Sequence, residues 1–323
     1  MSAHPKPEVT VIISVYKRID FLARALQSAL VQTFQGAEII VADDSGTAAA
    51  RALCEPWVKS GQVQYRANPQ TLGIARSLRG ALEEARGEFI SILNDDDLWE
   101  PNFLSSLVPP LRSDVERVVA FSDHWIVLED GSIDPKATEA NSRRYGRASL
   151  APGDVDNPVD FVLVKNGVPL AMAALFRKDA IDLSLLSSDV SGSYDFWISC
   201  LLAASGKKFY YVADRLTRYR VHPKSETARR DPAKSENLVF IFSQLLERNW
   251  FPEKTRYLRS RLAGAFFRLG RDRLFFNRLA DSRSYFRKSF ATRPGWRPIL
   301  ATLLSFLPRT LRIHLKLSLL SDA

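Results

Sequence analysis

Apolar residues in the first hundred positions follow two alternating patterns. Four short runs rich in β-branched residues predict strands buried on both faces of a sheet: 9–15, 38–42, 63–66 and 88–93. Three intervening segments repeat apolar residues at helical spacing: 21–32, 47–59 and 72–84. Because alternating strands and helices imply right-handed crossovers, the pattern predicts an α/β fold with a mostly parallel sheet flanked by helices.

The pattern becomes less regular after residue 117. Apolar runs at 118–122 and 125–128 predict two strands joined through Asp123 and His124, and the polar stretch 134–157 predicts a long loop. The chain then predicts one helix and one strand, at 194–204 and 208–212.

From residue 235 onward the pattern is helical. Four helices are expected, with breaks at Pro252, Gly270, Pro294 and Pro308: 237–249, 255–269, 272–291 and 297–306. A boundary within the charged stretch 224–234 separates them from the α/β pattern. The sequence therefore predicts an α/β domain at 1–230 and a basic α-helical C-terminal region at 231–323.

Composition excludes several classes of protein. With 46% hydrophobic and 11% aromatic residues, the 323-residue chain is not disordered as a whole. Its two cysteines, Cys54 and Cys200, exclude a disulfide scaffold and suit a reducing compartment. The first eight residues lack the apolar core of a signal peptide, and the late apolar run 299–307 is shorter than the ~20 residues of a bilayer span. We expect a cytoplasmic protein.

The net charge of +9 is concentrated in one region. Residues 248–316 contain 17 lysine and arginine residues against three acidic ones, whereas residues 1–247 are mildly acidic. No nucleic-acid recognition motif accompanies the basic region, so nucleic acid is not an expected partner. A solvated helical surface and a face that docks on an anionic membrane, through residues 248–317, both remain open.

Carboxylates follow two of the predicted strands. Asp95, Asp96 and Asp97 come directly after the strand at 88–93, and Asp43 and Asp44 end the strand at 38–42. Each group has a local explanation, because an acidic turn or a helix cap would also use these residues. Ligands bind at the carboxyl ends of parallel strands, however, and crowded carboxylates there favour Mg²⁺ or Mn²⁺.

Five segments together resemble family 2 glycosyltransferases in their order and spacing: 11–18, 38–47, Asn68 with 73–76, 86–90 and 93–101. The resemblance covers roughly residues 8–225. It implies a GT-A fold, a nucleotide-diphosphate-sugar donor, a divalent metal (Mn²⁺ or Mg²⁺) and inversion at the anomeric carbon.

The resemblance also implies roles for individual residues. Nucleotide contacts fall on Tyr16, Arg18, Asp43, Asp44 and Arg76, with Asp44 favoured over Asp43. The metal motif falls on Asp95, Asp96 and Asp97, with Asp97 the favoured direct ligand and Asp95 and Asp96 also near the nucleotide. His222 lies in a matching Tyr-Arg-x-His segment, where it would complete the metal shell or bond the diphosphate; a structural histidine is the alternative.

The catalytic base is the least defined part of the resemblance. The family's Glu-Asp pair before a helix falls on Gly192 and Ser193, so that pair is missing. Asp195 is the nearest carboxylate and our candidate base, with Asp189 as the fallback; Asp195 could also simply complement a helix dipole. The acceptor would face Asp123, His124 or the basic loop 143–147.

The resulting hypothesis is a metal-dependent inverting glycosyltransferase. It would move a sugar to a saccharide or lipid-linked acceptor in cell-surface polysaccharide biosynthesis, as a peripheral protein on the inner face of the cytoplasmic membrane. Two alternatives remain. One is a sugar-nucleotide-binding module without turnover, suggested by the missing pair. The other is a nucleotidyltransferase, which would use a glycine- and arginine-rich phosphate loop that residues 11–18 lack.

Overall fold

Strand β1 (Val9–Val15) lies among parallel neighbours, and all seven of its residues are buried. It pairs in parallel with β2 (Ala37–Asp43) on one side and β4 (Phe89–Asn94) on the other. β2 also pairs in parallel with β3 (Val63–Ala67). The uninterrupted β-branched runs therefore form the parallel, doubly covered strands that they predict, and the predicted α/β fold class is confirmed.

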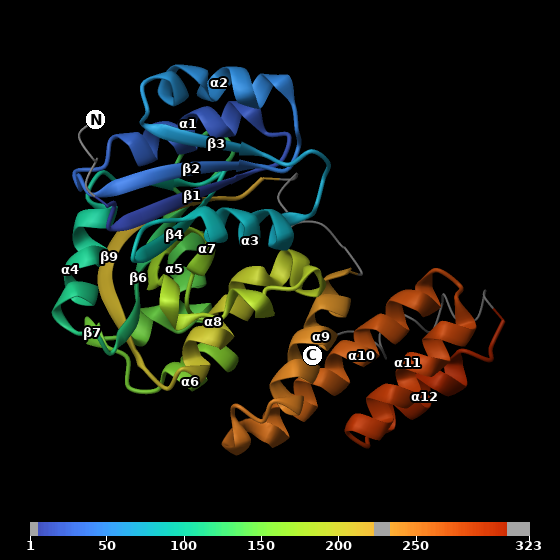
Figure 1. Ribbon diagram of the computed structural model, residues 1–323. Helices are drawn as coiled ribbons and strands as arrows, with labels where there is room; N and C mark the ends of the chain where they lie inside the picture. Colours follow the sequence, from blue (N-terminus) through green and yellow to red (C-terminus); the bar gives the residue numbers. More distant parts are fainter. Residues whose placement is uncertain (1–5, 223–232, 309–323) are drawn as a thin grey trace. The chain divides into compact units, whose positions relative to one another are not determined.

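The structure is a computed structural model that describes residues 6–222 and 233–308. The chain divides into two compact units, Met1–Arg229 and Arg230–Ala323. Figure 1 shows the sheet with its helices in the first unit and the helices of the second.

Five more strands complete the sheet: β5 (Leu98–Trp99), β6 (Arg117–Val127), β7 (Gly153–Asp154), β8 (Ala174–Arg177) and β9 (Lys208–Arg220). Within residues 6–222 the nine strands run in the order β3-β2-β1-β4-β8-β6-β9-β5, with β7 beside β9. β8 is antiparallel to both β4 and β6, and β6 is parallel to β9. β4, β6 and β9 therefore end at the same edge of the sheet.

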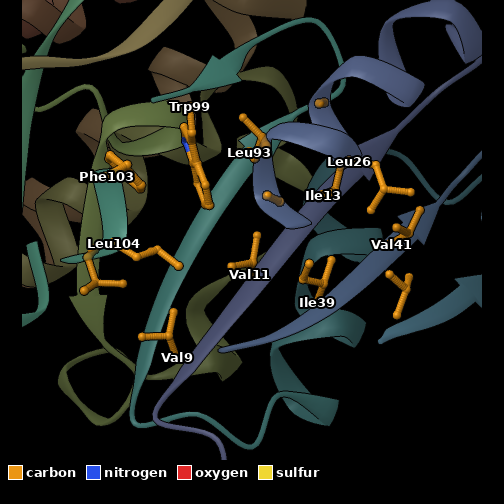
Figure 2. Packing of buried hydrophobic residues seen from close by; sticks show 14 of the residues in the cluster. Val9, Val11, Ile13, Leu26, Ile39, Val41, Leu93, Trp99, Phe103 and Leu104 are labelled. Atoms are coloured by element: carbon orange, nitrogen blue, oxygen red, sulfur yellow. The ribbon is translucent and has the colours of Figure 1, made fainter. Parts of the chain in front are cut away.

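Helices cover both faces of the sheet. Figure 2 shows the core on one face, where side chains of β1, β2 and β4 pack against α1 (Ile19–Leu30) and α4 (Phe103–Ser113). The same core includes residues of α2 (Ala48–Lys59). On the other face, α3 (Ile74–Glu84) packs against β1 and β2, and α7 (Leu170–Ala173) packs against β4. α8 (Tyr194–Ala204) packs against α7 and α6 (Pro158–Leu163).

Two expectations for residues 118–157 are wrong. The two strands expected at 118–122 and 125–128 are one strand, β6, whose register against β9 shifts at Ser122 and Asp123. The irregular step interrupts the apolar pattern, and the sequence alone shows it as a break. The expected loop 134–157 contains α5 (Pro135–Arg144), which Asp134 caps by accepting from the Ala137 N–H at 2.9 Å.

The strand expected at 208–212 also ends too early. β9 continues to Arg220, because its second half pairs with β6 on one side and with β5 on the other. This extension brings the Tyr-Arg-x-His segment to the edge of the sheet where β4 ends.

Four helices form the described part of the second unit: α9 (Ala233–Glu247), α10 (Thr255–Phe275), α11 (Leu279–Thr292) and α12 (Trp296–Leu304). Their core gathers Leu274, Phe286, Ala301 and Leu304. The break expected at Gly270 is wrong: α10 runs through it, and this glycine lets the Phe286 ring approach the α10 backbone closely. Within residues 6–222 and 233–308, no helix combines the length and apolarity that a membrane span requires.

Candidate active site

The carboxyl ends of three parallel strands meet at one edge of the sheet. The pairing register places Val15 opposite Asp43 and Ser14 opposite Asn94. The polar residues that follow these strands are therefore neighbours, as the pattern of strand ends predicts.

The acidic segment after β4 is buried. Asp95, Asp96 and Asp97 are 1%, 9% and 0% exposed. Burial raises the pKa of Asp95 to about 7, against the lowering influence of Arg18. Burial, together with the neighbouring Asp96, also raises the pKa of Asp97. Three crowded carboxylates of low exposure need positive charge, which excludes the solvated acidic turn as a description of this segment.

Arg18 supplies part of that charge. Its guanidinium forms an ion pair with Asp95 and a second one with Asp96 at 2.5 Å, and the Tyr16 backbone N–H donates to Asp95 at 3.3 Å. Residues just after β1 thus bind residues just after β4. The Tyr16 side chain itself is 47% exposed, so its ring faces solvent beside the acidic segment.

The end of β9 closes the other side of the acidic segment. Arg220 donates its backbone N–H to Asp97 at 3.0 Å and its side chain to the Asp96 carbonyl at 3.1 Å. His222, 3% exposed, places its Nε2 3.1 Å from Asp96 Oδ2 and its ring beside Phe21. The sequence-predicted metal residues Asp95, Asp97 and His222 are thus gathered around Asp96.

Asn94 connects this segment to α8. Its Oδ1 accepts from the Tyr194 hydroxyl at 3.1 Å and from the Ser14 hydroxyl at 3.4 Å, and its Nδ2 donates to Asp97 at 3.2 Å. Asp195, the candidate base, follows Tyr194 in the first turn of α8. The Phe196 N–H donates to Asp195 at 2.8 Å, and burial raises the pKa of Asp195 above its ordinary value.

Asp43 and Asp44 have internal partners. Asp43 accepts from the Ser45 N–H at 2.7 Å and from the Tyr65 hydroxyl at 2.5 Å. Asp44 accepts from Asn68 and from the backbone N–H groups of Leu72 and Gly73, each at 2.8 Å. Asp44 therefore binds the start of α3, whereas Thr47 caps α2. The nucleotide contacts assigned to this pair stay predictions.

Arg76 and the fallback base lie near one another. Arg76, in the first turns of α3, donates to the Ser188 hydroxyl at 3.5 Å. Asp189 is the next residue, is exposed, and accepts from the Ser187 hydroxyl at 2.7 Å. The same segment contains Ser191 at φ +32°, a left-handed conformation that a serine rarely adopts.

A cavity of about 790 Å³ opens at the edge of β9 between its pairings with β5 and β7. Its lining includes Glu100, Asp123, Trp125, Glu139, Arg147 and Arg215. Within it, Asp123 accepts from Arg147 at 2.7 Å and from the Ser142 hydroxyl. His124 is 4% exposed, and burial followed by the charge of Arg147 lowers its pKa to about 3. The neutral, buried imidazole thus lies beside Asp123, which lines the cavity.

The acidic segment suits a cation held only partly by the protein. In the described part of the chain no three or more His, Cys, Asp or Glu side chains converge as a preformed metal cage. Mg²⁺ and Mn²⁺ bound with nucleotides take one or two carboxylates and complete their shell with phosphate oxygens and water. Asp95 and Asp97 fit that role, because their raised pKa values show that added positive charge would stabilise both carboxylates.

Two residues that donate hydrogen bonds to Asp97, namely Asn94 and Arg220, were not predicted from the sequence as part of the site. Arg220 had a signal, since it lies between Tyr219 and His222 in the segment already singled out. Asn94 is 100 positions from Tyr194 in the chain. Only tertiary packing makes them partners, with α8 against α7 and α7 against β4, so the sequence carried no sign of this contact.

Comparison with known proteins finds matches to the region that contains β1, β2 and β4. The family model described as glycosyl transferase family 2 matches residues 10–162. An uncharacterized glycosyltransferase of Rickettsia typhi is 26% identical over 223 residues, which cover 68% of this chain and 66% of that protein. The succinoglycan biosynthesis protein ExoO of Rhizobium meliloti is 28% identical over 156 residues, 48% of this chain and 44% of that protein. The matched region thus spans less than two thirds of both relatives.

Solved structures show the same fold. The crystal structure of Staphylococcus aureus TarS 1-349 with UDP-GlcNAc has a TM-score of 0.60 and 16% identity, covering 92% of this chain and 79% of that one. The mannosyltransferase PcManGT from Pyrobaculum calidifontis, in complex with GDP-Man and Mn²⁺, has a TM-score of 0.57 and 18% identity, covering 96% and 83%. The architecture is therefore GT-A-like.

Proposed function

Because residues 10–162 identify this chain as a member of glycosyltransferase family 2, we propose that it transfers a sugar from a nucleotide-diphosphate donor to a saccharide or lipid-linked acceptor, with inversion at the anomeric carbon. Membership in this family argues against the nucleotidyltransferase alternative.

The observation that carries this proposal is the junction of Arg18 with the buried residues Asp95, Asp96, Asp97 and His222 at the carboxyl end of β4. It concentrates negative charge and a guanidinium at the edge where an α/β sheet binds nucleotides. TarS and PcManGT, which share the fold, are described in complex with UDP-GlcNAc and with GDP-Man. A nucleotide sugar at this junction is the ligand that agrees with both.

A divalent cation, Mn²⁺ or Mg²⁺, would be held by Asp95 and Asp97, with His222 beside them. Bound there, it would supply charge that stabilises the departing diphosphate. Other residues of the chain position the carboxylates and contact the nucleotide. Arg18 fixes Asp95 and Asp96, and Arg220 fixes Asp97 from the end of β9. Tyr16, exposed beside them, is available to contact the nucleotide.

Asp195 is the proposed base that takes the proton from the acceptor hydroxyl as it attacks the donor. The hydrogen bond from Tyr194 to Asn94 supports this role, because it ties the first turn of α8 to the acidic segment. Burial raises the pKa of Asp195, which strengthens it as a base. Asp189 is the fallback in the neighbouring turn, and Arg76 contacts that turn through Ser188.

The proposed product is a cell-surface polysaccharide made from the cytoplasmic side of the membrane. ExoO, the Rhizobium meliloti relative, is described as a succinoglycan biosynthesis protein. The basic residues of the region 248–317 support a place beside an anionic membrane, where lipid-linked acceptors are found. The acceptor is expected to approach near Asp123 and the 143–147 segment, where the cavity at β9 opens.

Donor hydrolysis in the presence of Mn²⁺ tests the proposal. A thermal-shift screen of UDP-, GDP- and dTDP-sugars first identifies the donor, and hydrolysis is then compared between wild type and Asp97→Ala. We expect a loss of about 10²-fold or more, because Asp97 is the proposed metal ligand. Asp156→Ala, which removes an exposed carboxylate, is the matched control and should retain the wild-type rate.

A binding module without turnover is the second candidate, favoured by Gly192 and Ser193 at the positions of the missing Glu-Asp pair. Donor binding without hydrolysis or transfer for any donor in the panel would support this candidate. Equal hydrolysis by wild type and Asp97→Ala would instead refute the metal assignment.

A further inference from the structure

Helix α12 has two apolar faces. One face packs into the core of the second unit, where Pro298, Ala301 and Leu304 are buried. The other face carries three large apolar side chains, and a fourth follows just past the helix; they are 62%, 49%, 62% and 62% exposed, in this order: Trp296, Ile299, Leu303 and Phe306. We call these four residues the α12 stripe. A second apolar face on a helix is normally buried against another surface, so this exposed face indicates a partner.

The α12 stripe is continuous along the helix. At 100° per residue, Trp296, Ile299 and Leu303 fall within about 60° of arc. Phe306 follows two residues past the end of α12. Scattered exposed apolar residues are common on soluble proteins, but three on one helix face, followed by a fourth directly after the helix, form a patch.

Positive charge surrounds the α12 stripe. Arg293 and Arg297 are exposed at its N-terminal end. Arg283 lies over the Phe306 ring at 3.8 Å and bonds Ser305 through its side chain, so a cation also lies at the C-terminal end. Residues 248–308 contain fourteen lysine and arginine residues but only three acidic ones.

We propose that the α12 stripe docks on the surface of an anionic lipid bilayer, with its apolar side chains inserted and its arginines at the headgroups. Tryptophan and phenylalanine suit the interfacial zone, and arginine suits anionic headgroups. The chemistry favours a bilayer over a second copy of this chain, because two copies joined by this face would bring their arginines together. The inference rests on the proposed action at a membrane, but its test needs no sugar transfer.

Flotation of the full-length protein with vesicles tests the docking. We expect binding to vesicles of phosphatidylglycerol and phosphatidylcholine, weaker binding to phosphatidylcholine alone, and at least a tenfold decrease between 0.1 and 0.5 M NaCl. Ile299→Ser with Leu303→Ser should reduce binding at least tenfold. Val115→Ser is the matched control, because Val115 is 69% exposed in the first unit and should be neutral.

Two further measurements separate the possible outcomes. Arg293→Gln with Arg297→Gln leaves the apolar side chains intact and should flatten the salt dependence. Circular dichroism of each variant shows whether the helices remain folded. Absence of flotation, equal flotation by the Ile299/Leu303 variant, or a dimer in sedimentation velocity that this variant dissociates would overturn the proposal. Donor hydrolysis should be unchanged in all of these variants, so a failure here leaves the proposed reaction untouched.

Discussion

Asp195 is the residue whose role most needs a direct test. Its pKa is raised by burial, and a base must be deprotonated to act, so activity should fall as the pH drops through a value above the ordinary aspartate range. Asp195→Asn should lower the rate of donor hydrolysis by about 10²–10⁴-fold, measured across the pH range with Mn²⁺. Asp189→Asn should cost less than tenfold; the reverse order would make Asp189 the base.

His124 predicts a dependence of stability on acidity. Arg147, Arg215, Asp123 and Asn141 face its buried ring, and its pKa in the folded chain is about 3, below the ordinary 6.5. Below pH 6.5 the unfolded chain binds a proton at this residue and the folded chain does not. The contribution of His124 to the unfolding free energy is therefore fully present above pH 6.5. It is lost as the pH falls from 6.5 toward 3.

Urea unfolding between pH 7 and pH 4 measures this effect. The unfolding free energy of wild type should decrease more steeply than that of His124→Gln, by up to about 1.4 kcal/mol per pH unit. Because the carboxylates are the same in both proteins, the difference isolates the histidine. Parallel slopes for the two proteins would contradict the lowered pKa.

At the level of single residues, the sequence predicts positions better than partners. Asp95 and Asp97 could be identified because carboxylates after buried parallel strands gather at one edge. Their actual neighbours depend on long-range pairing, as in the contact of Arg18 with Asp96, 78 positions away in the chain. Nothing in the spacing of residues shows such a contact.

The start of helix α3 is stabilised by Asp44, which directly follows strand β2. Asp44, 5% exposed at the end of β2, accepts from the N–H groups of Leu72 and Gly73 just before the helix. Asp44→Ala should therefore lower the unfolding free energy by about 1–3 kcal/mol even without a donor, because buried N–H groups lose a charged partner. Urea unfolding of the donor-free protein measures it, with Asp156→Ala as the control.

The outcome also separates two roles of the same residue. A residue that only contacts the nucleotide would leave the donor-free stability unchanged when replaced. An unchanged unfolding free energy for Asp44→Ala would thus contradict the structural role of Asp44 and favour the nucleotide contact alone.

Elements were predictable where one period continues without interruption. The buried runs of β1 and β2 and the helical spacing of α1 give their bounds within a residue or two. β6 could not be predicted as one strand, because its register shift breaks the alternation. α5 is mostly polar, so its local signs of a helix lay only at its ends: the cap at Asp134, the proline in its first turn and the two arginines in its last turn.

For the whole molecule, the net charge of +9 describes neither unit. The first unit is mildly acidic and places its carboxylates at strand ends, whereas the helical region holds the excess of arginine and lysine. The family 2 match, at residues 10–162, lies within the first unit. The predicted domain limits, 1–230 and 231–323, stay a prediction. The function of the second region stays a proposal.

The contact of Arg18 with Asp95 and Asp96 has a consequence for the stability of the whole chain. The Arg18 guanidinium already pairs with both of these carboxylates, so we expect folding not to depend on the metal. Treatment with EDTA should leave the melting temperature unchanged within about 2 °C, whereas excess Mn²⁺ should raise it. A large loss of stability in EDTA would mean that the metal, and not Arg18, balances the acidic segment.

A divalent cation bound at Asp95, as proposed, would therefore compete with Arg18 for that carboxylate. The concentration of free cation in the cell would then set the fraction of the protein that carries the cation, while the cation-free form stays folded and able to bind it.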